Sequence, residues 1–254
     1  MSRRLVAPIF GMVTLLALWE SFVRLFDVRR FILLAPSTAV RYLWRFRSDY
    51  LSAAWVTVQH AAIGLLLALS VALLIGSVLV SNRFLETAAQ PVLTLIQVVP
   101  WVAYISSVVV WLGSGTAPAL FMVTVVCLPA FIFAAVDGMR SVEPSTLELM
   151  ASVNASRSEV LRRVRLPSAA PTLFTTLRFN LGLALAVAYY TEGANFSNKG
   201  IGAIGRRAAA DNHADRLWAA IFAIAIVGVG GLQLLALLER TLLHWHAAQR
   251  TESV

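Results

Sequence analysis

The chain has 254 residues, of which 59% are hydrophobic and 13% are charged. Soluble domains carry about 25% charged residues, so this composition and a mean hydropathy of +0.76 exclude an ordinary soluble enzyme and indicate a protein in lipid. The net charge of +8 does not indicate nucleic acid, because the arginines lie between apolar runs, where we expect them to anchor helix ends at headgroups. The single cysteine, Cys127, excludes an intrachain disulfide and is expected to pack as a small hydrophobic residue.

The N-terminus combines a basic start with a long apolar stretch, and no small-residue cleavage site follows it. We therefore expect an uncleaved first membrane helix rather than a signal peptide. A helix needs about 20 mostly apolar residues to cross the hydrocarbon, and six stretches meet this requirement, which predicts an all-α integral membrane protein. They are 5–25, 54–80, 86–112, 116–139, 170–192 and 217–240.

Polar segments connect these predicted spans. Tight turns are expected at 81–83 and 113–118, where Ser, Asn, Gly and Pro cluster. The longer connection 26–53 contains YLWRFRSDYL, an amphipathic sequence expected to lie along the membrane interface. A second long connection, 193–216, is rich in glycine.

We divide the chain into residues 1–53, with the first span and the amphipathic segment, and residues 54–254, a core of five helices. An even number of spans places both termini on the same side of the membrane. Lys and Arg are divided almost evenly between the two sets of connections, so charge bias alone does not decide which side is cytoplasmic.

The third polar connection, residues 140–167, contains the most local structure. Six charges fall within ELMASVNASRSEVLRRVRLP, residues 148–167. Pro144 suits a first helical turn and residues 145–148 match a capping box, so a short helix to about Val153 is predicted.

Asn154 follows this helix and, after glycine, is the residue type best suited to a left-handed turn. Ser156 and Glu159 match a second capping box, which predicts a second short helix. Glu159 is also spaced to pair with the arginines three and four residues later. Pro167 is expected to end this pattern and to mark the start of the fifth span. We call residues 140–167 the elbow; it is either a solvated connector or a docking surface with an apolar edge and a charged rim.

The elbow resembles the cytoplasmic EAA loop of bacterial ABC importer permeases. That pattern runs E-A-A, three residues, G, nine residues, I-x-L-P. Glu148 stands at the glutamate, Asn154 at the glycine and residues 166–167 at the closing Leu-Pro, with the spacing kept. Leu149 and Met150 replace the alanine pair.

Further motifs resemble the nitrate/sulfonate/taurine-type branch of these permeases, in the same order along the six predicted spans. They are Trp19-Glu20, Ala35-Pro36-Ser37, residues 97–111 with Pro100, Leu177-Arg178 and Gly200-Ile201-Gly202. The resemblance implies the type I ABC importer permease fold, with the elbow as coupling loop. It also implies a multi-pass protein of the bacterial inner membrane with both termini in the cytoplasm.

The resemblance implies a subunit that imports a small organic or inorganic nutrient, such as a sulfonate, nitrate, taurine or a small heterocycle. The chain has no GxxxxGK[ST] phosphate loop, so it is not expected to be an enzyme or to bind a cofactor or metal. ATP and Mg would be bound by a partner ATPase. The implied assembly has two permeases, expected to be a homodimer, two cytoplasmic ATPases and an extracytoplasmic solute-binding protein.

Two sets of residues are candidates for function. The elbow residues expected to couple to the ATPase are Glu148, Leu149, Met150, Asn154, Ser156, Arg157, Glu159, Leu161 and Pro167. Polar groups inside membrane spans are costly and often mark pathways. Those expected along the translocation pathway are Gln97, Tyr104, Ser106, Ser107, Arg178, Asn180, Tyr189, Tyr190 and Glu192. The alternative role for each is a helix–helix contact or, for tyrosine, a place at the interface.

Two other classes of protein compete with a permease. A membrane-embedded lipid-modifying enzyme would need clustered acids, histidines or metal ligands. Of the four histidines, His244 and His246 form only an HWH pair in a basic tail without carboxylates, and the sequence has no Ser/His/Asp or paired-carboxylate arrangement at a plausible membrane surface. A stand-alone secondary carrier would need intramembrane acids for ion coupling. Only Glu20 and Glu192 are available, both near span ends, so the permease interpretation is favoured.

Overall fold

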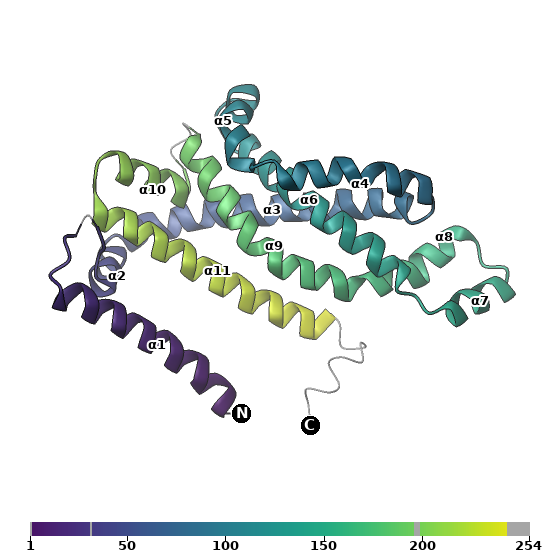
Figure 1. Ribbon diagram of the computed structural model, residues 1–254, viewed down its shortest axis with the longest axis horizontal. Helices are drawn as coiled ribbons and strands as arrows, with labels where there is room; N and C mark the ends of the chain where they lie inside the picture. The colour runs from purple at the N-terminus through teal and green to yellow at the C-terminus, as the bar shows by residue number, and fades with distance from the viewer. Residues whose placement is uncertain (1, 31, 196–198, 243–254) are drawn as a thin grey trace.

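A computed structural model of the protein describes residues 2–30, 32–195 and 199–242, most of which lie in helices. In chain order these are α1 Ser2–Leu25, α2 Pro36–Arg45, α3 Arg47–Leu79, α4 Arg83–Val98, α5 Trp101–Leu112, α6 Ala117–Arg140, α7 Pro144–Ser152, α8 Arg157–Val160, the π-helical turn η1 Leu161–Arg165, α9 Leu166–Ala194, α10 Ile201–Ala210 and α11 Ala214–Leu242. The long helices α3, α6, α9 and α11 form the body of the molecule, with α2 and α10 at one end and α7 and α8 at the other (Figure 1).

Among the described residues, four helical segments are long and apolar enough to cross a membrane: α3, α6, α11 and Arg157–Ala194, which runs from α8 through α9. If the bent pair of α4 and α5 counts as one span, the described residues contain five candidate membrane spans. These segments confirm the all-α membrane fold and match five of the six predicted spans. The sixth, 5–25, coincides with the 24-residue helix α1, which is not in this set, so its crossing of the membrane stays a prediction.

The predicted span 86–112 is not one helix. Val99 has extended backbone angles, φ −66° and ψ 124°, because the ring of the following Pro100 disfavours a helical conformation at this position. α4 and α5 therefore meet at a bend of 92°. Figure 1 shows α5 rising out of the layer of long helices.

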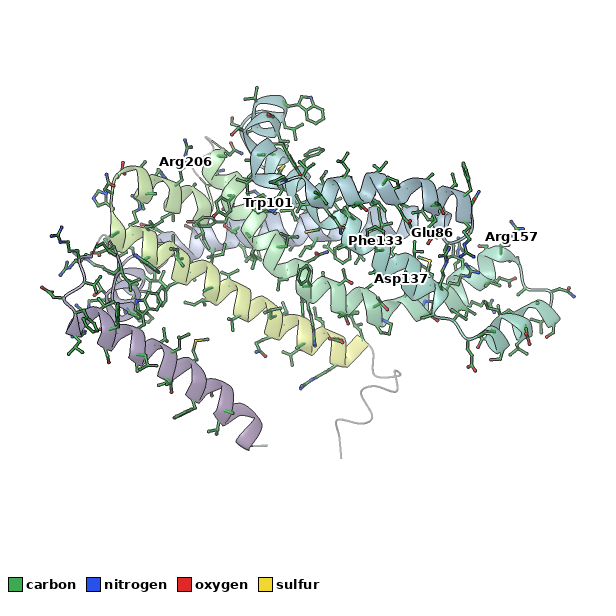
Figure 2. All side chains as sticks on the ribbon, viewed as in Figure 1. Glu86, Trp101, Phe133, Asp137, Arg157 and Arg206 are labelled. Atoms are coloured by element: carbon green, nitrogen blue, oxygen red, sulfur yellow. The ribbon has the colours of Figure 1, made fainter. Side chains whose placement is uncertain are left out.

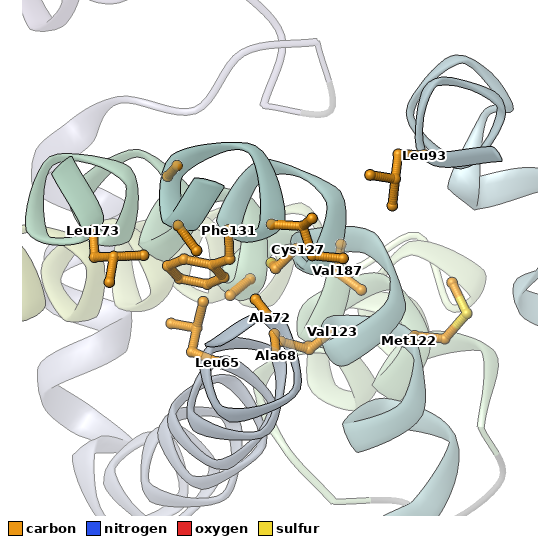
Figure 3. Packing of buried hydrophobic residues seen from close by; sticks show 14 of the residues in the cluster. Leu65, Ala68, Ala72, Leu93, Met122, Val123, Cys127, Phe131, Leu173 and Val187 are labelled. Atoms are coloured by element: carbon orange, nitrogen blue, oxygen red, sulfur yellow. The ribbon is translucent and has the colours of Figure 1, made fainter. Parts of the chain in front are cut away.

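The core is centred on α6, which packs between α3 and α9. Ala68 and Ala72 of α3 have no exposed surface, and such small side chains allow membrane helices to approach closely. The buried ring of Phe131 on α6 points towards Leu65 of α3 and Leu173 of α9 (Figure 3). Apolar contacts between three long helices thus form the rigid body of the protein.

Both long connections contain more helix than predicted. The predicted amphipathic segment, residues 42–51, is divided at Phe46 between α2 and the start of α3. The Gly-rich connection contains α10, which begins after Gly200 at φ 90°. The tight turns predicted at 81–83 and 113–118 are confirmed, the first by Asn82, whose side chain caps α4.

The chain direction alternates along the bundle. α3, α6 and α11 run from the end with α2 and α10 towards the elbow, and α4 and α9 run back (Figure 1). The start of α1 and the end of α11 both point away from α2 and α10 (Figure 1). The connections on either side of α10 therefore lie opposite the elbow.

Candidate coupling elbow and translocation cavity

The first helix of the elbow has its N-cap two residues earlier than its predicted capping box. Glu143 is the N-cap of α7 and Pro144 lies in the first turn, so residues 145–148 are already helical and the predicted box is wrong. The side chains of Glu148 and Leu149 are exposed, and Met150 is half-buried. The predicted coupling residues of α7 are thus mainly accessible to solvent.

The turn between α7 and α8 is confirmed at Asn154, whose φ is 52°. The Asn154 N–H donates to the Ala151 carbonyl at 3.0 Å, and the Ala155 N–H donates to the Met150 carbonyl at 2.9 Å. This pair of bonds is a Schellman motif, which satisfies the last carbonyls of a helix through one left-handed residue. Asparagine tolerates that conformation better than most side chains.

The second predicted capping box is confirmed at Ser156 and Glu159. The Ser156 Oγ accepts from the Glu159 N–H at 3.3 Å, and the Glu159 carboxylate accepts from the Ser156 N–H at 2.9 Å. The pKa of Glu159 is lowered, first by this backbone N–H and then by the Ser156 hydroxyl, because both bonds favour the charged carboxylate. The elbow is therefore shaped by bonds between neighbours in sequence.

Pro167 does not interrupt the helix as predicted. α8 continues through η1 into α9 as one 38-residue helical segment, and the Leu166 N–H donates to the Leu161 carbonyl five residues earlier. This wide turn lies where a proline ring would otherwise clash with the carbonyl four residues before it. Leu161 is half-buried against the core, while Pro167 is exposed.

The exposed apolar edge of the elbow lies on α7 and the residue after it. Leu149 and Val153 are 63% and 65% exposed, and their four-residue spacing places them on one face. Arg157 is also exposed. Val153 was missed as a candidate, although its spacing from Leu149 was a usable signal.

A cavity of 1110 Å³ lies between α5, α9, α10 and α11. Three predicted pathway residues line it: Ser106, Tyr189 and Tyr190. Most other lining residues are apolar or glycine. Arg206 of α10 is the charged residue among the described residues that line the cavity. Arg206 was not singled out because α10 itself was not predicted.

The structure places three more predicted pathway residues outside this cavity. Gln97 on α4 and Ser107 on α5 are exposed, and Tyr104 is half-buried against the core. None of the three is among the residues that line the cavity. Their predicted role in the pathway therefore has no support from this cavity.

Asn180 and Arg178 join α9 to neighbouring helices. The buried Asn180 side chain donates from Nδ2 to the Cys127 carbonyl of α6 at 3.3 Å, and its Oδ1 has no hydrogen-bond partner among the described residues. Arg178 forms an ion pair with Glu239 of α11, with 2.5 Å between Nη2 and Oε2. This ion pair fits the helix–helix contact that was the alternative role for Arg178.

Glu192 lies at the centre of a buried polar cluster near the end of α9. Glu192 is 1% exposed. Its Oε1 lies 2.8 Å from His60 Nδ1. Its Oε2 accepts from the Thr57 hydroxyl at 2.9 Å and from the Gly202 N–H at 3.1 Å. The Thr57 Oγ1 also accepts from the Ile201 N–H at 2.9 Å. We call Thr57, His60, Glu192 and the N–H groups of Ile201 and Gly202 the clasp, since they join α3, α9 and α10. The carboxylate also complements the positive end of the α10 dipole.

Comparison with known proteins gives a consistent result. Residues 61–244 match the family model described as binding-protein-dependent transport system inner membrane component. The riboflavin transport system permease protein RibX of Chloroflexus aurantiacus is 30% identical, covering 93% of this chain and 89% of that protein. The taurine transport system permease protein TauC of Escherichia coli is 26% identical, covering 97% and 92%, and the nitrate import permease protein NrtB of Synechococcus elongatus is 25% identical, covering 73% and 67%.

The fold is also similar to that of a solved ABC transporter chain. A chain from an inward-facing structure of the MetNI methionine ABC transporter superposes with a TM-score of 0.60 at 16% identity, covering 76% of this chain and 97% of that chain. The family model covers well over half of the sequence. The chain therefore belongs to the family of binding-protein-dependent transport system inner membrane components and is a permease subunit of an ABC importer, in the nitrate/sulfonate/taurine branch.

Proposed function

We propose that two copies of this chain form the translocation pathway for a small nutrient and that the elbow of each copy docks on a cytoplasmic ATPase. The nutrient is a sulfonate, nitrate, taurine or a small heterocycle, delivered by an extracytoplasmic solute-binding protein. ATP and Mg are bound by the ATPase. The elbow and both termini lie on the cytoplasmic side of the inner membrane.

The observation that carries this proposal is the shape and position of the elbow. α7 and α8 lie beyond the long helices (Figure 1), and their turn is closed by its own hydrogen bonds. Leu149 and Val153 offer an exposed apolar edge, with Glu148 and Arg157 beside it. An apolar centre with a charged rim is typical of a docking surface.

The cavity supports a pathway made by two chains. It lies at the surface of the helix bundle, bounded by α5, α9, α10 and α11 of a single copy. A second copy related by two-fold symmetry would close such a surface with the same residues. The arrangement also explains the many small lining residues, because they let helices of two copies approach closely.

Co-purification with the ATPase in detergent, followed by an ATPase assay, tests the docking role. Glu148→Lys reverses a charge on the exposed face of α7, and we expect it to abolish the complex or to lower substrate-stimulated ATPase activity at least about tenfold, the effect of losing one charge-assisted contact. Glu143→Lys makes the same charge reversal at the exposed residue before α7, and should leave the activity within about twofold.

Membrane insertion of both variants should match that of the unmodified chain. Normal coupling in Glu148→Lys would remove Glu148 from the docking surface. If the unmodified chain purifies without an ATPase and transports without ATP, the proposed function itself is wrong.

A further inference from the structure

We propose that a pocket between the end of α3 and the elbow binds the phosphate of an anionic phospholipid headgroup. The pocket has a volume of 450 Å³, and among the described residues that line it the charged ones are Arg157 of α8 and Arg165 of η1. This site goes beyond the proposed function and does not depend on it, because it needs only the membrane fold.

The lining of the pocket combines positive charge with hydroxyl groups. Val80 and Ser81, at the end of α3, form one side, and the polar residues of the other side are Arg157, Ser158 and Arg165. The remaining lining residues are apolar, and none of the described lining residues is acidic. A recess lined by charges of one sign concentrates the field of those charges. The pocket therefore favours an anion.

Both guanidinium groups can accept a new partner. In the described part of the chain, neither Arg157 nor Arg165 forms a hydrogen bond or an ion pair. Arg157 is exposed at the rim, whereas Arg165 is half-buried. A charge that is removed from water is costly unless a counter-charge compensates it. An anion in the pocket would supply the counter-charge that Arg165 lacks.

The acidic side chains at this end of the molecule do not fill the pocket. Figure 2 shows Arg157, Glu86 and Asp137 at the same end of the bundle. Glu86 is bound by Arg140 of α6, with 2.6 Å between Oε1 and Nη1, and the Glu159 carboxylate accepts from the N-cap of its own helix. Glu86, Asp137 and Glu159 are not among the lining residues. The counter-ion must therefore come from outside the described chain.

The position of the pocket along the helices identifies the source of this anion. Ser81 directly follows the predicted span 54–80, and Arg165 stands five residues before the predicted span 170–192. Both sides of the pocket thus reach the level at which spans leave the hydrocarbon, where lipid phosphates lie. Basic pockets between membrane helices at this level bind anionic headgroups. The apolar edge proposed to contact the ATPase, Leu149 and Val153, does not line the pocket.

A phosphodiester matches the groups in the pocket. Each planar guanidinium can donate two parallel N–H groups to two phosphate oxygens. The Ser158 hydroxyl, which forms no hydrogen bond within the described residues, can donate another. Phosphatidylglycerol presents this phosphate without a positive charge, whereas phosphatidylcholine adds a trimethylammonium group that the arginines repel. Inorganic phosphate shares the chemistry but lacks acyl chains, so it separates a lipid site from a site for a free anion.

Arg162 provides a matched control for Arg165. Both belong to η1 and carry the same charge, but Arg162 is exposed and does not line the pocket. Neither residue is among those predicted to couple to the ATPase. Arg165→Gln and Arg162→Gln therefore make the same change in net charge, one inside the pocket and one outside it.

The experiment is native mass spectrometry of the full-length chain in detergent. The chain is titrated with phosphatidylglycerol, phosphatidylcholine or inorganic phosphate at about 0.15 M salt, where charges that are not in contact are largely screened. We expect one tightly bound phosphatidylglycerol per chain, with an affinity at least about tenfold above that of phosphatidylcholine. Arg165→Gln should weaken this binding about tenfold, as for the loss of one charged hydrogen bond, and Arg162→Gln should change it by less than about twofold.

Arg157→Gln, at the exposed rim, should weaken binding by a similar factor and replaces Arg165→Gln if that variant does not fold. Equal affinities for the two lipids, or equal losses in Arg165→Gln and Arg162→Gln, would overturn the inference. Inorganic phosphate that binds as tightly as phosphatidylglycerol would show a site for a free anion instead. If phosphatidylglycerol does not bind and Arg165→Gln instead weakens co-purification with the ATPase, the pocket receives the partner protein and the lipid assignment is wrong.

Discussion

The elbow and the clasp lie at opposite ends of the molecule. The hydrogen bonds of the elbow join residues close in sequence, whereas those that join α3 to α9 in the clasp connect residues far apart in sequence. In the elbow, the bonds join residues three to five positions apart, such as Ser156 with Glu159 and Ala155 with Met150. In the clasp, Glu192 bonds to residues 132 and 135 positions away. The elbow is largely exposed, whereas the Glu192 side chain is buried.

This difference indicates two separate tasks. Bonds between neighbours in sequence do not depend on the surrounding helices, so the elbow keeps its shape whether or not a partner contacts it. The bonds of the clasp exist only while α3, α9 and α10 are docked. A buried carboxylate is strongly destabilising when its partners are lost, so the clasp fixes the wall of the cavity and the elbow is suited to contact a moving partner.

The largest effect is expected from Glu192→Ala. It leaves the Gly202 N–H and the side chains of Thr57 and His60 without their carboxylate, which lowers the free energy of unfolding by about 3–5 kcal/mol. Denaturant unfolding in detergent measures this change. Glu148→Ala, at an exposed position of the elbow, is the control and should change stability by less than about 0.5 kcal/mol. Equal unfolding midpoints for the two variants would contradict a structural role for the clasp.

A smaller effect is expected from Thr57→Val, which keeps the side-chain shape and removes the hydroxyl. The buried Ile201 N–H then loses its acceptor, at a cost of about 1–3 kcal/mol. Hydrogen exchange at Ile201 should accelerate in step with the loss of stability. Thr87→Val on α4 is the matched control, because among the described residues the exposed Thr87 hydroxyl donates only to the Arg83 carbonyl of its own helix. An equal loss of unfolding free energy in both variants would contradict the prediction that the bond between α3 and α10 contributes more to stability than a bond within one helix.

The smallest effect is expected from Ser156→Ala in the elbow. Loss of the capping box should accelerate amide exchange in the first turn of α8 about fivefold, the usual effect of losing an N-cap, and leave the unfolding midpoint unchanged. Acid should act in the same way, because the Glu159 pKa is lowered from its ordinary value of 4.5: the bond is present above that value and lost as the pH falls through the lowered pKa. A shift of the global midpoint by Ser156→Ala would show that the elbow and the core are not independent.

The same contrast explains what the sequence could predict. Asn154, Ser156 and Glu159 act on residues close by, so their signals are visible in a short stretch, and the turn and the second capping box were predicted correctly. Thr57 and Glu192 stand 135 positions apart, and nothing local connects them. Glu192 was predicted as a pathway residue and as an ionisable group near a span end, but its partners on α3 and α10 were not predicted.

Two errors concern proline. The sequence contained the signal for the bend at Pro100, but the apolar run on both sides predicted one span. Pro167 was expected to end a helix, and the π-helical turn before it keeps the helix continuous instead. Proline restricts the preceding turn, and whether the chain bends or widens depends on packing: Val99 and Pro100 are exposed, whereas Leu161 and Leu166 pack against the core.

This continuity has a mechanical consequence. The segment Arg157–Ala194 contains 38 residues, so at 1.5 Å per residue it is about 57 Å long when followed along its helical path. The segment begins in the elbow, and Tyr190 and Glu192 lie near its other end. Under the proposed function, the ATPase would thus move the cavity wall through one backbone, without a relay of side chains.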